Sequence, residues 1–321
     1  MFAAYHSLDQ VPAGFGPSAL TVGNFDGVHA GHAQILREVV ERARADRWLA
    51  LAVTFHPHPT LVVAPDRVPR LLTTPAARLA LFERAGIDAA LVLPFTPDVA
   101  RLEPEQFVRD ILVERLAARA VIVGPNFRFG RAHAGDVAAL EVFGRRHGFE
   151  VRVVEPVRRR GELVSSSALR SLIQDGKLSL AARMLGRPFA VDGRVVRGHG
   201  VGSKQTVPTL NLAPETEVLP ARGVYATCTS DLDSARRWPS VTNVGFRPTF
   251  DGRDLSIETF LLRPFEGEPP ARISVAFWRR LRDEIKFPSP EELRAQILRD
   301  AAAAEKFFHR LRAVSPKEVI S

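Results

Sequence analysis

Short apolar runs alternate with amphipathic segments over the first half of the chain, up to about residue 155. The apolar runs have the length of buried strands, and the segments between them repeat apolar residues with helical spacing. This alternation predicts a parallel, doubly wound α/β (Rossmann-like) sheet, because each strand returns to the sheet through a helix. The expected strands are Leu20–Gly23, Leu49–Phe55, Ala89–Leu93, Ala120–Gly124 and Glu150–Val154, and the expected helices lie near residues 31–45, 75–85, 104–117 and 135–147.

The pattern changes after Gly186-Arg187-Pro188. Short alternating runs broken by glycine and proline follow over residues 188–282, which is typical of an antiparallel β-barrel or sandwich. Two short helices precede this region and one helix follows it. We therefore expect two domains, residues 1–185 and 186–321. The expected strands of the second domain are Val191–Val196, Val218–Thr229, Ser240–Phe246, Ser256–Leu262 and Arg272–Leu281, and the expected helices are Ser165–Gly176, Leu178–Leu185 and one that begins at Pro290.

The composition is that of an ordinary globular protein, with 45% apolar and 25% charged residues among 321. No apolar stretch reaches the ~18 residues of a membrane span, and the first residues show no basic segment followed by an apolar one. Neither a membrane segment nor a signal peptide is therefore expected. Cys228 is the only cysteine, which excludes an internal disulfide and a multi-cysteine metal site and fits a reducing cytoplasm.

Basic residues outnumber acidic ones and give a formal net charge of +8. Such an excess favours polyanionic ligands, either nucleotides or nucleic acid, although an arginine-rich solvated surface would give the same count. A nucleic-acid-binding barrel would require a basic stripe with interleaved aromatic residues, whereas the arginines of residues 188–282 are scattered. The charge therefore fits nucleotide sites without a nucleic-acid partner.

The segment Thr21–His32 (TVGNFDGVHAGH) joins the first expected strand to the first expected helix. A strand, a tight glycine turn and a helix bring phosphates to a helix N-terminus, whose free amides and partial positive charge favour anions. His29 and His32 would lie there, where their imidazoles could donate to phosphate oxygens and offset charge on a leaving pyrophosphate. Gly31 between them would let the main chain approach a ligand. Incidental histidines on a polar loop are the alternative, which the preceding strand disfavours.

Three further segments could contribute to this site. Gly124–Gly130 (GPNFRFG) follows a strand and carries Asn126, although a loop with a buried phenylalanine pair is equally compatible. Ser165–Arg170 (SSSALR) opens a helix, where hydroxyls could cap amides or bind phosphate and Arg170 could clamp a phosphate; a serine N-cap with a surface arginine explains the same pattern. Thr54–Pro59 (TFHPHP) could offer two histidines to zinc, but no further ligands stand nearby in sequence.

In this order, GNFDGVHAGH, TFHPHP, VGPNFRFG and SSSALR resemble the nucleotidyltransferase module of bacterial bifunctional riboflavin kinase/FAD synthetases. HxGH alone is shared with other adenylyltransferases and with class I tRNA synthetases, whose lysine-rich loop and anticodon-binding region are not visible here. The resemblance implies that His29 and His32 bind ATP phosphates and stabilise the transition state. The family often has aspartate at Asn126 and threonine at Ser167. The implied nucleotide-binding residues are Gly23, Asn24, Phe25, Gly31, Asn126, Ser166, Ser167 and Arg170.

A second constellation lies in the expected β-rich region. Gly198–Lys204 (GHGVGSK) alternates glycines and ends in lysine, so its amides and Lys204 could bind phosphate, although a barrel turn that needs positive φ would look the same. Thr209 and Asn211 point the same way from an extended segment, and their neutral oxygens could hold magnesium; a strand edge before a turn is the alternative. Glu258 lies in an apolar run, where it either faces outward or accepts a proton from a substrate hydroxyl.

GHGVGSK, PTLN, GVY, TNVGFRPTF and IETF resemble the riboflavin kinase domain of the same enzymes. The resemblance implies an antiparallel six-stranded β-barrel, with Mg-ATP held by Thr209 and Asn211 and with Glu258 as the catalytic base. The implied nucleotide-binding residues of this domain are Gly198, Gly200, Gly202 and Lys204. Departures from the family pattern concern ATP and flavin contacts, and they lie at Ser203, where arginine is usual, at Thr206-Val207, at Leu210 and at Arg263–Gly267.

Together these resemblances imply a transferase with two activities in flavin cofactor biosynthesis. The barrel would phosphorylate riboflavin with ATP to FMN, and the α/β domain would adenylylate FMN with a second ATP to FAD and pyrophosphate, both with Mg²⁺. Riboflavin, FMN and ATP are the expected partners, with no nucleic acid and no membrane. A protein that retains the riboflavin kinase activity alone is the alternative, against which the histidine pair and Arg170 argue. The sequence does not indicate the oligomeric state.

Overall fold

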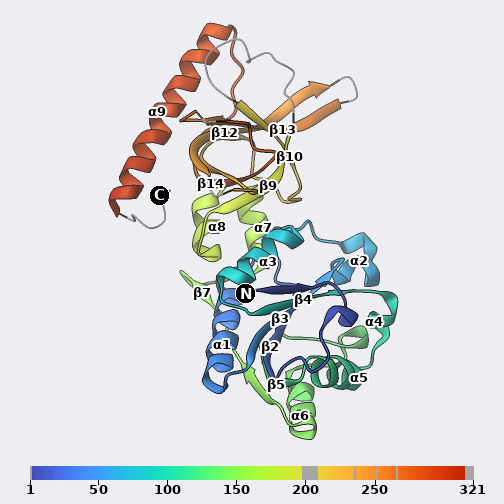
Figure 1. Cartoon of the computed structure of the whole chain (residues 1–321). Coiled ribbons are helices and arrows are strands. Elements are labelled where there is room, and N and C mark those ends of the chain that lie inside the picture. Colours follow the sequence, from blue (N-terminus) through green and yellow to red (C-terminus); the bar gives the residue numbers. More distant parts are fainter. Residues whose placement is uncertain (1, 197–208, 235, 250–251, 265–266, 315–321) are drawn as a thin grey trace. The chain divides into compact units, whose positions relative to one another are not determined.

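The computed structural model describes residues 2–196, 209–234, 236–249, 252–264 and 267–314, and it divides into two compact units, Met1–Ser166 and Ser167–Ser321 (Figure 1). The first unit is an α/β fold and the second is built around a β-barrel. Both classes agree with the sequence prediction.

Among the described residues, a sheet of six strands forms the centre of the first unit, in the order β1-β4-β3-β2-β5-β6. Every pair in it is parallel, so the predicted doubly wound sheet is confirmed. The edge strand β1 was not predicted, because a run of three residues is too short to carry a periodic signal. The strands are β1 (Ala3–Tyr5), β2 (Ser18–Val22), β3 (Leu49–His56), β4 (Ala89–Pro94), β5 (Ala118–Val123) and β6 (Glu150–Val153).

The predicted helices of the first unit are present with small changes at their ends. The segment expected as one helix over 104–117 is a short α-helix, α5, continued by a π-helical stretch, η3. A small hairpin, β7 (Arg158–Arg159) with β8 (Glu162–Leu163), follows β6. The helical elements are η1 (Leu8–Gln10), α1 (Ala30–Asp46), α2 (Pro59–Val63), η2 (Pro65–Arg67), α3 (Pro75–Arg84), α4 (Pro97–Arg101), α5 (Pro104–Gln106), η3 (Phe107–Arg115), η4 (Arg131–His133) and α6 (Val137–His147).

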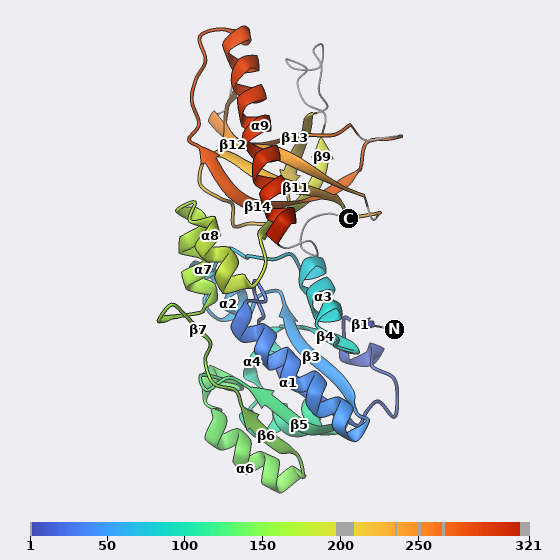
Figure 2. The same ribbon diagram turned by 90° about the vertical axis from the view of Figure 1, so that its left-hand side faces the viewer.

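The two faces of this sheet carry side chains of different size. One face is lined by larger residues, which pack against η3 and α6. The other face is lined largely by alanines, against which α1 and α3 pack, and Figure 2 shows α1 running along the strands. Small side chains permit close approach of a helix to a sheet, so α1 is held tightly with its N-terminus at the carboxyl end of β2. The alanines are Ala19, Ala50, Ala52, Ala90 and Ala120.

The second unit contains a closed antiparallel barrel of six strands in the order β10-β13-β12-β11-β14-β9, which confirms the barrel and excludes a sandwich. Strand β11 begins at Gly223 rather than at the predicted Val218; Val218 is buried but makes no ladder pairs. The strands are β9 (Phe189–Val196), β10 (Thr209–Pro214), β11 (Gly223–Asp231), β12 (Arg237–Thr249), β13 (Gly252–Leu261) and β14 (Arg272–Arg282), and the helices are α7 (Ser166–Gln174), α8 (Leu178–Leu185) and α9 (Pro290–Val314).

The barrel interior holds a chain of buried hydroxyl groups. Thr227 Oγ1 lies 2.8 Å from Ser240 Oγ and 2.7 Å from Thr242 Oγ1, and Thr242 Oγ1 lies 3.0 Å from Thr259 Oγ1. All four side chains are fully buried, and their mutual hydrogen bonds remove the cost of burying them. Because side chains alternate along a strand, the residues between these point outward.

Helix α9 covers part of the outer face of the barrel, as both views show (Figures 1 and 2). Ala304 and Phe308 of this helix pack against Val224, Ala226 and Val241 on β11 and β12. No helix among the described residues is long and apolar enough to cross a membrane.

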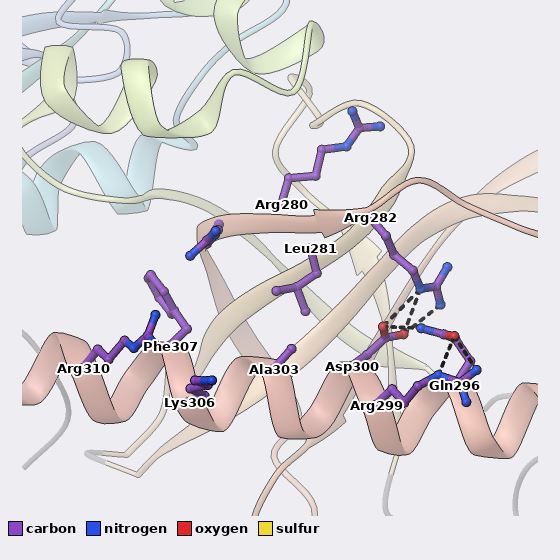
Figure 3. A pocket seen from close by; sticks show the side chains of 11 residues that line it. Arg280, Leu281, Arg282, Gln296, Arg299, Asp300, Ala303, Lys306, Phe307 and Arg310 are labelled. Carbon is purple, nitrogen blue, oxygen red and sulfur yellow. Dashed lines mark hydrogen bonds and ion pairs between the residues drawn. The ribbon is translucent and has the colours of Figure 1, made fainter.

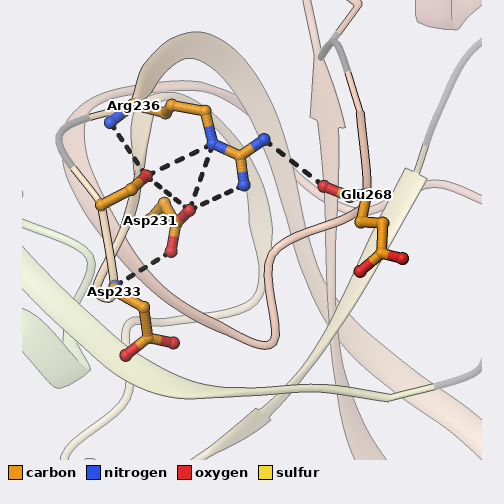
Figure 4. A network of polar contacts seen from close by, with 5 residues as sticks. Asp231, Asp233, Arg236 and Glu268 are labelled. Atoms are coloured by element: carbon orange, nitrogen blue, oxygen red, sulfur yellow. Dashed lines mark hydrogen bonds and ion pairs between the residues drawn. The ribbon is translucent and has the colours of Figure 1, made fainter.

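At the turn after β11, a buried carboxylate organises the chain (Figure 4). Asp231 accepts hydrogen bonds from Ser234 Oγ at 2.6 Å and from Arg236 Nη2 at 2.9 Å, and Arg236 Nη1 also donates to the carbonyl of Glu268 at 3.4 Å. Burial would raise the pKa of Asp231, but the hydrogen bonds from Ser234, the Asp233 N–H and Arg236 outweigh it and hold that pKa below its ordinary value. The turn therefore depends on an ionised Asp231.

Two candidate active sites

The turn after β2 brings the chain sharply round to the start of α1. Gly23 N–H donates to the carbonyl of Val53 at 3.0 Å, which extends the β2–β3 pairing by one residue. Phe25 and Val28 then adopt positive φ values of 47° and 37°, and Gly27 has a φ of 81°. A Cβ on Gly27 would lie 2.9 Å from Leu72 Cδ1, so the turn requires glycine there. Strained non-glycine residues of this kind concentrate at functional sites.

His29 and His32 stand at the N-terminus of α1, as predicted. His29 is the N-cap residue, and its Nδ1 accepts the main-chain N–H of His32 at 3.3 Å. The two rings stack, with centroids 3.7 Å apart and planes 13° apart. Because Nδ1 of His29 is an acceptor, the neutral ring carries its proton on Nε2, which makes Nε2–H a hydrogen-bond donor.

Because Gly31 has no side chain, the stacked histidine rings have room beside it. A Cβ on Gly31 would lie 3.2 Å from Cε1 and 3.3 Å from Nδ1 of the His29 ring. Phe25 supports the pair from the core: its ring meets His32 edge-on at 5.1 Å and Phe82 at 5.3 Å. Since Phe25 is buried in the core, its side chain orients His32, and a predicted contact with nucleotide would come from its main chain.

Asp26 anchors the turn to the segment before α3. Its carboxylate accepts the N–H of Leu72 at 2.9 Å and the N–H of Thr73 at 3.2 Å. Its carbonyl accepts a hydrogen bond from the hydroxyl of Ser166 at 2.8 Å. Ser166, a predicted nucleotide-binding residue, therefore also holds the main chain of the turn. Asp26 is 2% exposed. Asp26 was not among the predicted site residues, although it is the fourth residue of the GNFDG segment that pointed to this turn.

Arg78, which the sequence pattern also did not single out, anchors the turn at a second point. This residue of α3 is 4% exposed, and its Nη1 donates to Thr54 Oγ1 at 3.0 Å. Thr54 Oγ1 donates in turn to the carbonyl of Asn24 at 3.2 Å. Burial lowers the pKa of Arg78, and the negative charge of Asp26 opposes that shift. An arginine four residues before the buried Phe82, on the apolar face of a helix, was the sequence signal.

The loop after β5 reaches the same edge of the sheet, because β5 is the neighbour of β2. A Cβ on Gly124 would touch Ile35 of α1 at 3.8 Å, which places the loop beside the first turns of that helix. Asn126 is exposed at its tip. The half-buried Phe127 stacks on the buried Phe129 with centroids 5.3 Å apart, so a stacked phenylalanine pair and an exposed amide occur in the same loop.

The remaining predicted residues of this site divide between the two units. Ser167 is exposed and Arg170 half-buried on α7, within the second unit, and both stay predictions from the motif. His58 caps α2 by accepting the N–H of Thr60 at 3.3 Å. Among the residues with described positions, no three histidine, cysteine, aspartate or glutamate side chains are grouped as a metal would require, and the zinc alternative gains no support.

The barrel brings the predicted kinase residues into one row. Asn211 on β10 lies directly opposite Glu258 on β13, and Glu258 lies directly opposite Asn243 on β12. Thr209 shares the face of Asn211, two residues away along the strand. Because Glu258 alternates with the buried Ile257 and Thr259, this row is on the outer face of the barrel.

A second carboxylate reaches the same face. A Cβ on Gly245 would collide with Glu284 Oε1 and would lie 3.2 Å from Asn243 Nδ2, so any larger residue at 245 would push the Glu284 side chain away from its observed position. Glu284 follows β14 in a segment without periodic pattern, which is why the sequence analysis missed it. All four predicted phosphate-binding residues of this domain lie outside the described residues, namely Gly198, Gly200, Gly202 and Lys204.

A basic cleft of about 480 Å³ lies between β14 and α9 (Figure 3). Its one acidic lining residue, Asp300, is 6% exposed and accepts from Arg282 Nη2 at 2.8 Å and from Gln296 Nε2 at 2.8 Å. Positive charge therefore dominates the cleft. The bases that line it come from a strand and a helix distant in sequence, and they are Arg279, Arg280, Arg282, Arg299, Lys306 and Arg310.

Family models match the two units separately. Residues 13–168 match the model of FAD synthetase, and residues 185–308 match the model of riboflavin kinase. The fold and the two constellations thus define a two-domain transferase, with a nucleotidyltransferase half and a phosphotransferase half. Relatives with both activities in their names match almost the whole chain.

The bifunctional riboflavin kinase/FMN adenylyltransferase of Escherichia coli (strain K12) is 35% identical over 303 residues, which cover 94% of this chain and 96% of that protein. The protein of the same name from Pseudomonas fluorescens is 36% identical over 291 residues, covering 88% and 91%. The chain belongs to the bifunctional riboflavin kinase/FMN adenylyltransferase family. A solved structure from Streptococcus pneumoniae, named Macrolide-efflux Protein, has a TM-score of 0.82 at 25% identity and covers 95% of this chain.

Proposed function

We propose that this protein makes FAD from riboflavin in two steps, one in each unit. The barrel transfers the γ-phosphoryl group of ATP to the ribityl 5′-hydroxyl of riboflavin, and the α/β unit joins the AMP of a second ATP to FMN with release of pyrophosphate. The observation that carries this proposal is the presence of two separate constellations: the stacked histidines at the head of α1 and the Asn211–Glu258 pair on the barrel. Each lies within the segment that its family model matches.

In the adenylyl transfer, an FMN phosphate oxygen attacks the α-phosphorus of ATP and pyrophosphate leaves. The free amides at the head of α1 and the Nε2–H of His29 provide donors for the triphosphate, and His32 adds a second imidazole beside it. Such preorganised donors stabilise the charge that builds up on the leaving pyrophosphate. The proposed nucleotide contacts of this unit are completed by the main chain of Gly23, Asn24, Phe25 and Gly31, and by Asn126 and Ser166. Ser167 and Arg170, which belong to the second unit, are proposed as nucleotide-binding residues on the motif alone.

In the phosphoryl transfer, Glu258 accepts the proton of the riboflavin 5′-hydroxyl as the hydroxyl oxygen bonds to the γ-phosphorus, and the bond from the γ-phosphorus to the β-phosphate oxygen breaks with release of ADP. Thr209 and Asn211 present neutral oxygens on the face that also carries Glu258. Such hard oxygens suit Mg²⁺, which when bound with ATP would neutralise phosphate charge. Gly198, Gly200, Gly202 and Lys204 are proposed as phosphate-binding residues on the motif alone.

The partners in this proposal are small molecules, namely riboflavin, FMN and ATP, with neither nucleic acid nor membrane. The cytoplasm is the proposed location, because the single cysteine is buried and the substrates are nucleotides. We propose the domain boundary at residues 185–186, at the start of the segment that the riboflavin kinase model matches, whereas α7 and α8 cluster with the barrel in the compact unit Ser167–Ser321.

A product time course tests the two-step function. Purified protein receives riboflavin and Mg-ATP, and riboflavin, FMN and FAD are separated and quantified while pyrophosphate is measured in parallel. FMN should rise first and FAD should follow, with one pyrophosphate released per FAD. Accumulation of FMN without FAD, even when FMN is supplied directly, would show that the protein has only the riboflavin kinase activity.

A further inference from the structure

Arg78 is an exception to the rule that charged side chains stay at the surface. It is 4% exposed, and its Nε has no hydrogen-bond partner among the described residues. An arginine is seldom fully buried unless it is paired, because removing a cation from water is costly. No salt bridge to Arg78 lies within the described part of the chain, although the negative charge of Asp26 acts on it, so its burial calls for a role beyond packing.

The contacts of Arg78 lead to the turn that carries the histidines. Its Nη1 donates to Thr54 Oγ1 at 3.0 Å, and that hydroxyl donates to the carbonyl of Asn24 at 3.2 Å. Thr54 is 2% exposed near the carboxyl end of β3, so both hydrogen bonds are shielded from water. Shielding strengthens such a chain and limits its geometry.

The same part of the chain also fixes the turn at a second point. The residues just before α3 donate to the Asp26 carboxylate from Leu72 N at 2.9 Å and from Thr73 N at 3.2 Å. Thr73 Oγ1 additionally accepts the N–H of Gly27 at 3.1 Å. The turn is therefore held at Asp26 by main-chain amides and at Asn24, through Thr54, by the buried guanidinium.

We propose that Arg78 is a positioning residue for adenylyl transfer. It acts through Thr54 on the main chain of Asn24 and thereby sets where the amides and imidazoles at the head of α1 stand relative to the triphosphate. This inference rests on the proposed function of the first unit.

The test uses the full chain with four single variants. Arg78→Met removes the charge and the donors at similar length, and Arg78→Lys keeps the charge. Thr54→Val removes the relaying hydroxyl with little change in shape. Arg84→Met is the matched control, because it makes the same change at an exposed position of the same helix. KM for ATP and kcat are measured for FAD formation from supplied FMN, and FMN formation by the same preparation serves as the internal reference.

We expect Arg78→Met to raise KM for ATP in FAD formation about tenfold and to lower kcat, with FMN formation within about twofold of the unaltered protein. Arg78→Lys should recover part of the loss, and Arg84→Met should show none. If both residues act through one path, Thr54→Val should raise KM in the same direction, and the double variant should be no worse than Arg78→Met alone. Should Arg78→Met fail to fold, Thr54→Val and Arg78→Lys carry the test.

A merely structural role would reduce the fraction of active molecules and leave KM of the remainder unchanged. An unchanged KM for ATP in the Arg78 and Thr54 variants, or additive effects in the double variant, would therefore overturn the inference. Absence of FAD formation by the unaltered protein would instead overturn the proposed function. The two failures are thus distinguishable in one set of assays.

Discussion

Glu258 on β13 lies directly opposite Asn211 on β10, although the two residues are far apart in the sequence. The pairing puts a carboxylate and a carboxamide on the same outer face of the barrel, with Asn243 in register on the far side of Glu258. The sequence left two alternatives open for Glu258: an outward-facing carboxylate without a catalytic role, or a base that accepts a proton from a substrate hydroxyl. Its position between two amides favours chemistry, because the amides can orient the carboxylate and a bound phosphate together.

Glu258→Gln should abolish most FMN formation and leave FAD formation from supplied FMN intact. A general base contributes about 10²–10⁴-fold to rate, so kcat of the kinase step should fall within that range. The exposed Glu268, whose side chain makes none of the recorded contacts at the turn of Figure 4, offers the matched control Glu268→Gln. Equal loss of both activities in a folded Glu258→Gln protein would contradict the assignment.

His29→Asn separates the cap of α1 from the imidazole chemistry. Asparagine is a good N-cap residue, so thermal stability should stay close to that of the unaltered protein. FAD formation should fall about 10²–10³-fold, since removing one preorganised donor costs about that much, while FMN continues to accumulate. His32→Ala should have a similar effect on FAD, and His6→Ala, at an exposed position, should have none. Normal FAD formation by His29→Asn would contradict a role for its imidazole.

Gly245→Ala tests the approach of Glu284 to the kinase face. The added Cβ forces the flexible Glu284 carboxylate away from this face, so kcat for FMN formation should fall to about the value of Glu284→Ala. Removing the carboxylate in the double variant Gly245→Ala with Glu284→Ala relieves the collision, and its kcat should equal that of Glu284→Ala alone. If the loss of kcat in the double variant equals the sum of the losses in the two single variants, the collision with Glu284 is not the cause of the Gly245→Ala effect.

The turn at Asp231 should make stability depend on pH. A carboxyl whose folded pKa is below its unfolded value stabilises the fold above the unfolded pKa, about 4, and this contribution is lost as pH falls through the folded value. Asp231→Asn should therefore cost about 2 kcal/mol at pH 7, and its difference in Tm from the unaltered protein should shrink below about pH 4.

Asp233→Asn is the control for that measurement, since Asp233 contributes its main-chain N–H and keeps its side chain exposed. Its Tm should follow that of the unaltered protein at every pH. A Tm difference for Asp231→Asn that stays constant between pH 3 and pH 7 would show that the ionised carboxylate is not what the turn requires.

Local periodicity was sufficient for most of the architecture. The alternation of strands with helices determined the parallel sheet, because each strand buries apolar residues and each helix presents one apolar face, and both patterns are visible in a short window. The breaks at glycine and proline determined the change to an antiparallel region, and HxGH after a strand determined that His29 and His32 stand at a helix N-terminus. The edge strand β1 was not predicted, because three residues are too few to show a periodic pattern.

Tertiary structure alone decided which residues support these motifs. The register that sets Asn211 opposite Glu258 depends on barrel closure, which no single segment encodes. Glu284 reaches Gly245, and Arg78 reaches Asn24 through Thr54, only because packing joins segments remote in sequence. Short-range patterns record how each segment buries its own apolar side chains, whereas a buried charge finds its partners across the fold. The physical reason is that hydrogen bonds are directional and depend on the final position of both groups.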